Sequence, residues 1–300
     1  MSPAPNRPVA AALWMTGSIT GFSLLAVAGR QIGQDLDPFE IMGYRSAIGI
    51  VAIVAAALVS GQLGRIRATH LPMHGLRNAL HFSGQVLWLF ALTRIPLAQL
   101  FALEFSYPIL VALGAPLLLG ERLRRATVLT AATGFAGVLI VARPFGEGGL
   151  SIGLVAAMAC AVGFAGSAIV TKRLTRATSL WSILFWLAVI QATLGFALAG
   201  WDGQISWPPD RAMPWVLVIG LAGLGAHLCL TRALSLAPAS MVTPMDFLRL
   251  PLIAVVGALF YAEPLDPAVI LGGAVILGAN WLNLRAGSGG PAGPKRHLGN

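Results

Sequence analysis

The sequence predicts an all-α polytopic membrane protein with ten transmembrane helices in two five-helix inverted repeats. Three observations predict this fold class. First, 57% of the 300 residues are hydrophobic and only 10% are charged, against about a quarter in soluble domains. Second, apolar runs of about 20 residues, the length that crosses a bilayer, recur along the chain. Third, a shift of 142 positions aligns one half of the sequence with the other.

The apolar runs divide the chain into ten expected spans. The first half holds spans at residues 9–29, 38–59, 73–93, 96–119 and 126–142. The second half holds spans at residues 151–171, 178–200, 213–231, 239–261 and 266–284. The expected domains are therefore one repeat over 9–142 and one over 151–285. We expect residues 1–8 to form a short cytoplasmic segment and the Gly/Pro-rich, basic residues 286–300 to form a disordered cytoplasmic tail.

The positions of Lys and Arg predict the orientation of these spans. With the N-terminus inside, thirteen of the twenty Lys and Arg residues fall in cytoplasmic segments and four in outer loops. Cytoplasmic loops of membrane proteins carry such an excess, so we expect an inner-membrane protein with both termini in the cytoplasm. The first apolar run imitates a signal peptide, but its Gly21-Phe22 pair aligns with Gly163-Phe164, so we expect it to be retained.

Five spans per half have a geometric consequence. Because five is an odd number, the second half must enter the membrane from the side opposite to the first. Many secondary transporters use such inverted repeats to build two exchangeable states around one central site. The duplication therefore predicts a carrier that works by alternating access. We expect its cavity to lie between the halves and to be lined by the third, fourth, eighth and ninth spans.

The duplication is clearest in the stretch from Ala91 to Leu123. Within it, Glu104 aligns with Asp246 after the shift of 142 positions. Each copy is an apolar helix of membrane-spanning length that carries one carboxylate. A carboxylate in hydrocarbon is costly, so such a residue is by default a functional-site hypothesis.

The third span carries a stripe of polar and aromatic side chains. Helical spacing puts six of them on one face: His74, Arg77, Asn78, His81, Gln85 and Trp88. The stripe either faces a water-filled cavity or forms a buried polar seam between helices. We favour the cavity, because so many hydrogen-bonding side chains in lipid would be strongly penalised. His227, in the eighth span, is isolated, and we expect it to be a packing residue.

The fourth span contributes Glu104 and Tyr107, which are three residues apart and share a helix face. Pro108 removes a backbone donor and predicts a kink beside them. Arg45 in the second span starts from the same outer surface. At about 1.5 Å per residue, Arg45 and Glu104 both lie roughly 10–12 Å deep. We expect the two to pair, either to bind substrate or for a purely structural purpose.

The ninth span mirrors the fourth, with Asp246 and Arg249 three residues apart. Asp246 either exchanges a proton, which would couple transport to the proton gradient, or stays ionised as a fixed contact for a substrate ammonium group. The sequence leaves both alternatives open. The predicted substrate-binding residues are Arg45, Arg77, Asn78, His81, Gln85, Trp88, Glu104, Tyr107, Asp246 and Arg249.

Other classes of function are disfavoured. The net charge is +9, but the basic residues sit in short loops, so membrane topology explains them better than nucleic-acid binding. An enzyme is not expected, because the chain has no HExxH motif, no nucleophile elbow and no Cys/His metal cluster. Cys160 and Cys229 lie deep in apolar runs and are expected to pack, so we expect neither a cofactor nor a metal.

One motif occurs once in each half. It reads Ala91-Leu92…Pro96…Pro108…Gly120-Glu121-Arg122-Leu123 in the first half and Ala233-Leu234…Pro238…Pro251…Ala262-Glu263-Pro264-Leu265 in the second. The second copy departs by having Ala262 where the first has Gly120, and by a proline one position later. With the ten spans, this motif resembles the EamA branch of the drug/metabolite transporter superfamily over residues 9–285. A shorter segment, Phe39-Glu40…Tyr44-Arg45, resembles the S-adenosylmethionine and riboflavin carriers of that family.

The resemblance and the paired charges together predict a carrier for a small organic metabolite in the lipid bilayer. A site with both carboxylates and arginines suits a zwitterion, so an amino acid or related metabolite is the leading substrate class. Export is the direction that the resemblance favours. The alternatives are uptake of a larger metabolite such as S-adenosylmethionine or riboflavin, and a passive channel. The oligomeric state is left open, with a homodimer as one option.

Overall fold

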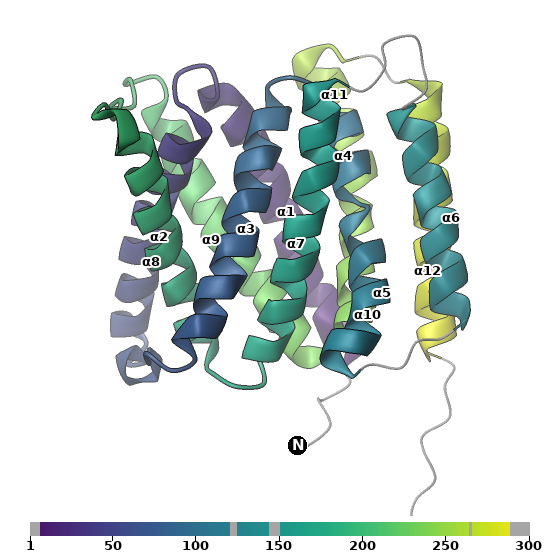
Figure 1. Ribbon diagram of the computed structural model, residues 1–300, viewed down its shortest axis with the longest axis horizontal. Coiled ribbons are helices and arrows are strands. Elements are labelled where there is room, and N and C mark those ends of the chain that lie inside the picture. The colour runs from purple at the N-terminus through teal and green to yellow at the C-terminus, as the bar shows by residue number, and fades with distance from the viewer. Residues whose placement is uncertain (1–6, 121–124, 144–150, 264–265, 289–300) are drawn as a thin grey trace, which may run out of the picture.

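The computed structural model describes residues 7–120, 125–143, 151–263 and 266–288. Throughout these ranges the regular structure is helical, without a strand. Figure 1 shows the long helices standing side by side, with their ends gathered at two opposite faces. In the described ranges, six helices are long and apolar enough to cross a membrane: Pro8–Ile32, Pro38–Val59, Leu97–Leu119, Ile152–Leu174, Leu180–Asp202 and Met213–Leu236. The chain is a multi-pass membrane protein.

The helices follow the expected spans closely. The first half contains α1 (Pro8–Ile32), α2 (Pro38–Val59), α3 (Leu71–Leu92), α4 (Leu97–Glu104), α5 (Tyr107–Leu119) and α6 (Arg125–Ala142). The second half contains α7 (Ile152–Leu174), α8 (Leu180–Ala199), α9 (Met213–Leu236), α10 (Ala239–Val242), α11 (Arg249–Tyr261) and α12 (Pro267–Ser288). Short 3₁₀ helices lie at Leu63–Arg65 (η1), Gly200–Asp202 (η2) and Thr243–Leu248 (η3). α12 continues to Ser288, so the first residues of the expected disordered tail are helical, and the rest of that tail lies outside the described residues.

The fourth span is broken beside Glu104. α4 ends at Glu104, and α5 begins at Tyr107. Pro108 has no N–H group, so the α-helical hydrogen-bond ladder cannot continue through it. Ser106 instead donates its backbone N–H to Leu103 O at 3.1 Å, in the tighter three-residue spacing. The kink predicted beside Pro108 is thus confirmed as a break in the helix.

The second half is interrupted at the corresponding place. α10 ends at Val242, η3 follows, and α11 begins at Arg249. Asp246 lies inside η3, so the buried carboxylates of Glu104 and Asp246 both sit where a spanning helix is interrupted. Non-helical backbone at membrane depth is tolerated only where protein buries it or where it lines a cavity. The two interruptions therefore mark the place where a binding site is expected.

Helices from opposite halves of the chain pack against each other. α1 packs along α9, α3 along α7, α2 along α8, and α6 along α12. Figure 1 shows α2 and α8 at one end of the bundle and α6 and α12 at the other. The halves are therefore interleaved, and the space between them is the centre of the molecule.

Glycine allows the closest of these approaches. A Cβ atom on Gly195 of α8 would lie 2.5 Å from the backbone nitrogen of Gly43 on α2. A Cβ atom on Gly163 of α7 would lie 2.6 Å from Leu80 O on α3. Small residues at helix interfaces let backbones approach within the membrane. These two positions hold the α2–α8 and α3–α7 pairs in contact.

The repeated motif gives the same backbone conformation after α5 in the first half and after α11 in the second. Gly120 follows α5 with φ +66°, and Ala262 follows α11 with φ +51°. Both are left-handed, so the substitution of Ala for Gly in the second copy leaves strain at Ala262. The carboxylate of Glu263 then pairs with Arg30 and accepts the backbone N–H of Leu97 at 3.0 Å. This contact caps the start of α4 with a residue from the other half.

Candidate functional site

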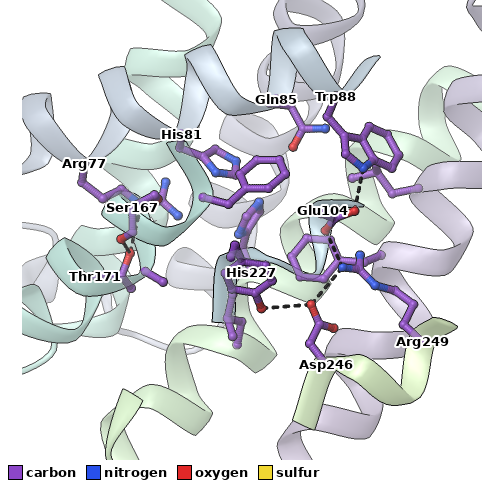
Figure 2. Close-up of a pocket in the computed structure, with 16 residues that line it drawn as sticks. Arg77, His81, Gln85, Trp88, Glu104, Ser167, Thr171, His227, Asp246 and Arg249 are labelled. Atoms are coloured by element: carbon purple, nitrogen blue, oxygen red, sulfur yellow. Dashed lines mark hydrogen bonds and ion pairs between the residues drawn. The ribbon is translucent and has the colours of Figure 1, made fainter. Parts of the chain in front are cut away.

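A cavity of about 580 Å³, part of it open to solvent, lies between the two halves. Figure 2 shows the side chains that line it. They come from α1, α3, α4, α5, α7, α9, η3 and α11: Phe22, Leu25, Arg77, His81, Gln85, Trp88, Glu104, Tyr107, Phe164, Ser167, Ala168, Thr171, His227, Leu230, Asp246 and Arg249. The sequence predicted linings from the third, fourth, eighth and ninth spans, and the structure adds α1 and α7.

Three charged side chains meet at one end of the cavity. Arg249 Nη2 donates to Glu104 Oε1 at 2.6 Å and to Asp246 Oδ2 at 2.8 Å. All three side chains are at most 5% exposed. When both carboxylates are ionised, the single guanidinium leaves one excess negative charge. We call Glu104, Asp246 and Arg249 the acidic triad.

Two neutral side chains donate hydrogen bonds to the carboxylates of the acidic triad. Trp88 Nε1 donates to Glu104 Oε2 at 2.7 Å, and the Tyr107 hydroxyl donates to Asp246 Oδ2 at 3.1 Å. Asp246 Oδ1 is buried and has no hydrogen-bond partner among the described residues. Both oxygens of Glu104 are occupied, so Asp246 Oδ1 is the acceptor of the triad that remains for a bound molecule.

Aromatic rings surround the guanidinium of Arg249. Its Cζ atom lies 4.8 Å from the ring centroid of Phe101, 5.2 Å from that of Phe22 and 5.3 Å from that of Phe105. Cation–π contacts at this range stabilise a buried cation, and Arg is the residue that most often makes them. The rings therefore hold Arg249 between its two carboxylates.

The opposite end of the cavity is basic. Arg77 Nε donates to the Thr171 hydroxyl at 3.2 Å, and Arg77 Nη1 donates to Asn78 Oδ1 at 3.0 Å. The rings of His81 and His227 meet edge to face with centroids 4.7 Å apart. Figure 2 shows Arg77, His81 and Thr171 across the cavity from the acidic triad. The cavity is therefore electrically polarised.

A model of the EamA-like transporter family matches the chain twice, at residues 9–143 and 151–285. The chain belongs to the EamA-like transporter family. The expected resemblance to this branch of the drug/metabolite transporter superfamily is confirmed. The family is one of transporters, not enzymes, so the polarised cavity is a candidate transport site rather than an active site.

Several characterised proteins resemble this EamA-like transporter over most of its length. A riboflavin transporter of Brucella anthropi is 30% identical over 92% of this chain and 98% of its own. The pseudopaline exporter CntI of Pseudomonas aeruginosa is 28% identical, over 85% and 89%. An S-adenosylmethionine uptake transporter of Rickettsia felis is 23% identical, over 89% of each. A solved crystal structure shares the fold with a TM-score of 0.69 at 24% identity, covering 92% of this chain and 96% of that one.

The predicted pair of Arg45 and Glu104 is wrong. Glu104 pairs with Arg249 and Trp88, which occupy both of its oxygens. Arg45 is 5% exposed, does not line the cavity and forms no ion pair within the described residues. Matched depth did not make the two side chains neighbours, because depth along each helix says nothing about how the helices are placed laterally.

One part of the polar stripe of α3 lines the cavity, and the other part is a buried seam between helices. Arg77, His81, Gln85 and Trp88 line the cavity of the transporter. His74 and Asn78 do not. Asn78 Nδ2 donates to Trp186 O at 3.3 Å, and Gln191 Nε2 donates to Asn78 Oδ1 at 3.2 Å, both residues of α8. This end of the stripe is a polar seam between α3 and α8.

Sequence reasoning missed part of the lining. His227 was expected to pack, yet it lies in the cavity. The shift of 142 positions aligns His227 with Gln85, and this was the signal that could have identified it. Ser167 and Thr171 of α7 also line the cavity, and their spacing of four residues puts them on one helix face. Within the described residues, no group of three or more His, Cys, Asp or Glu side chains is arranged to hold a metal ion.

Proposed function

We propose that this transporter is an alternating-access carrier for a small organic metabolite, with the polarised cavity as its substrate site. One observation carries the proposal. Tyr107 of the first half holds Asp246 of the second, while Arg249 of the second half holds Glu104 of the first. The shift of 142 positions exchanges these two contacts, because Tyr107 aligns with Arg249 and Glu104 with Asp246. A reciprocal site of this kind is what inverted repeats around a central cavity produce.

The helix pairing supports the same arrangement. The shift aligns α1 with α7 and α3 with α9, so it exchanges the α1–α9 pair with the α3–α7 pair. It aligns α2 with α8 and α6 with α12, so each of those two pairs is exchanged with itself. Our proposal is therefore ten spans in two inverted repeats, 9–142 and 151–285, in an inner membrane. Each repeat would rock against the other to open the cavity to one side at a time.

An amino acid or a related zwitterion is the proposed substrate class. Asp246 Oδ1 is an unoccupied carboxylate oxygen in a triad with one excess negative charge, which suits an ammonium group. Arg77 faces the cavity from the other end, which suits a carboxylate. The relatives include an exporter and an uptake carrier, so export stays a prediction from the family resemblance.

Riboflavin is the second candidate substrate, and two observations favour it. The riboflavin transporters of Brucella anthropi and Rhizobium johnstonii are 30% and 31% identical to this chain over more than 90% of its length. Four aromatic rings line the cavity and could stack on a flat ring system: Phe22, Trp88, Tyr107 and Phe164.

Counterflow in proteoliposomes tests the proposal. Vesicles containing the purified transporter are loaded with an unlabelled amino acid mixture or with riboflavin, and uptake of the labelled compound is followed. A carrier gives saturable uptake that internal substrate accelerates. Uptake that stays linear with concentration and ignores internal substrate would identify a passive channel instead. Reporter fusions at the two ends of the chain test the orientation, and both are expected to give cytoplasmic signals.

A further inference from the structure

The basic end of the cavity is a distinct group of side chains from three helices. It consists of Arg77 and His81 of α3, Ser167 and Thr171 of α7, and His227 of α9, which we call the basic lobe. Figure 2 shows Arg77, Ser167 and Thr171 on the far side of His227 from Glu104 and Arg249. The basic lobe and the acidic triad therefore face each other across the same cavity.

The charge of Arg77 is not neutralised by any described side chain. Arg77 is 3% exposed, and its hydrogen bonds go to Thr171 and Asn78, which are both uncharged. No carboxylate forms an ion pair with it among the described residues. Burying a cation without a counter-charge is costly, so proteins rarely keep one without a purpose.

A second unpaired cation lies behind the basic lobe. Arg45 of α2 is 5% exposed, and its buried Nη1 atom has no hydrogen-bond partner in the described part of the chain. Its guanidinium lies against Gly223 of α9, where an added Cβ would be 3.7 Å from Arg45 Cζ. Arg45 interacts electrostatically with Arg77, His81 and His227. Two uncompensated guanidinium groups thus act on one small region.

Unpaired ring nitrogens add to the basic lobe. His81 Nε2 and both ring nitrogens of His227 are buried and have no hydrogen-bond partner among the described residues. Buried polar atoms are nearly always paired, with protein, water or a ligand. Three such atoms beside an unpaired arginine indicate that a polar partner belongs between them.

We infer that the basic lobe is an anion subsite, in which Arg77 binds a carboxylate or phosphate group of the substrate and Arg45 supplies the second positive charge. This inference rests on the proposed function, since it assigns one end of the proposed substrate. The planar fork of a guanidinium matches either group in a two-point contact. Thr171 and Ser167 line the same end, and the ring nitrogens of His81 and His227 give it further hydrogen-bonding capacity. The substrate therefore carries an anionic group at the end opposite its contact with Asp246.

Thermal unfolding of the purified, full-length protein tests the subsite. The probes are sodium acetate, inorganic phosphate and two matched pairs, at fixed pH and ionic strength. Phenylalanine and phenylalaninamide differ in a carboxylate, whereas riboflavin 5′-phosphate and riboflavin differ in a phosphate. Because a ligand that binds the folded state raises Tm by mass action, a saturable rise is expected with a carboxylate or phosphate probe. The member of each pair that carries the carboxylate or phosphate should raise Tm more than the member that lacks it.

Arginine variants identify where the anion binds. Arg77→Gln should raise the apparent Kd for the anion about tenfold or more, because a hydrogen bond between charged groups is lost. Arg77→Lys should keep most of the affinity, and Arg232→Gln, at an exposed arginine of α9, should leave it unchanged. Arg45→Gln should also weaken anion binding. Because this variant removes no hydrogen bond of the fold, it replaces Arg77→Gln as the test if that variant does not fold. The inference would be overturned if no anion raised the Tm of the wild-type protein. It would also be overturned if the anion still raised Tm to the same extent in both Arg77→Gln and Arg45→Gln.

The inference and the proposed function fail in different ways. An arginine-dependent rise in Tm in a protein without counterflow would refute the carrier and keep the anion subsite. Counterflow of a neutral compound that no anion inhibits would keep the carrier and refute the subsite. Stronger inhibition of counterflow by the member of a matched pair that carries the carboxylate or phosphate, lost in Arg77→Gln, supports both.

Discussion

Arg249 donates to Glu104 at 2.6 Å and so joins the second half of the transporter to the first. The reciprocal contact, from Tyr107 to Asp246, joins the first half to the second at 3.1 Å. The aligned positions thus carry different donors, a guanidinium in one half and a phenol in the other. The shift of 142 positions exchanges the two contacts, yet one has a charged donor and the other a neutral donor.

Arg249 and Glu104 should be energetically coupled. Arg249→Gln strands two buried carboxylates, and breaking a buried ion pair costs about 3–5 kcal/mol. The free energies of unfolding of Glu104→Gln, Arg249→Gln and the double variant form a double-mutant cycle. We expect the double variant to be clearly more stable than the sum of the single effects predicts. The control cycle pairs Glu104 with Arg45, and its effects should add within about 0.5 kcal/mol. Coupling in the control but not in the first cycle would contradict the structure.

The reciprocal contacts predict the outcome of an exchange. Arg249→Tyr alone should lower the free energy of unfolding, because it leaves both carboxylates without a cation. Adding Tyr107→Arg places a cation at the aligned position of the other half, beside Asp246. We expect the double variant to recover more than half of the lost Tm. Tyr107→Phe with Arg249→Tyr, which supplies no cation, is the control and should recover nothing. A double variant no more stable than Arg249→Tyr would argue against the two-fold arrangement.

Arg45→Gln should maintain or raise the stability of the protein and weaken its transport of substrate. The guanidinium is buried without a described partner, so removing its charge removes a desolvation cost. We expect Tm without ligand to rise or stay level, while the substrate concentration for half-maximal counterflow increases. Stability that is given up at a functional site is common in proteins. A fall in Tm with unchanged transport would show that Arg45 has a structural role only.

Asp246→Asn separates two roles for that carboxylate. Asp246 Oδ2 is held by both Arg249 and Tyr107, which favours a fixed contact for a substrate ammonium group through Oδ1. We expect the variant to bind substrate more weakly at every pH tested. If it instead loses accumulation driven by a pH gradient and keeps normal counterflow, Asp246 carries the coupling proton. Asp210→Asn, at an exposed carboxylate, is the control.

Ala262→Gly should stabilise the protein. Ala262 has φ +51°, and a non-glycine residue in this left-handed conformation pays about 1–2 kcal/mol. Glycine removes that strain and loses about 0.5–1 kcal/mol to the greater freedom of the unfolded chain. Chemical unfolding should therefore show a net gain of about 0.5–1 kcal/mol. Gly120→Ala, at the aligned position, should have the opposite sign. Equal and negligible effects at both positions would show that the backbone relaxes freely there.

Local patterns in the sequence determined most of the fold. Hydrophobic runs set where helices lie, because the backbone in a membrane must satisfy its own hydrogen bonds and only long apolar helices do so cheaply. Pro108 marked the break beside Glu104 for the same reason. The repeated motif led to the transporter family, which the match to residues 9–143 and 151–285 confirms. The polar residues that the sequence places in apolar runs are buried in the structure, and their role in binding stays a prediction.

Only the tertiary structure decided which of those polar groups meet. Matched depth predicted Arg45 as the partner of Glu104, and lateral packing placed Arg249 beside Glu104 instead. His227 looked isolated along α9, yet α3 brings His81 within 4.7 Å of its ring centroid. Helical periodicity determines which way a side chain faces on its own helix, because it depends on neighbours within a few residues. The contacts between helices depend on how side chains far apart in the sequence pack together, and the sequence pattern of one helix contains no measure of that distance.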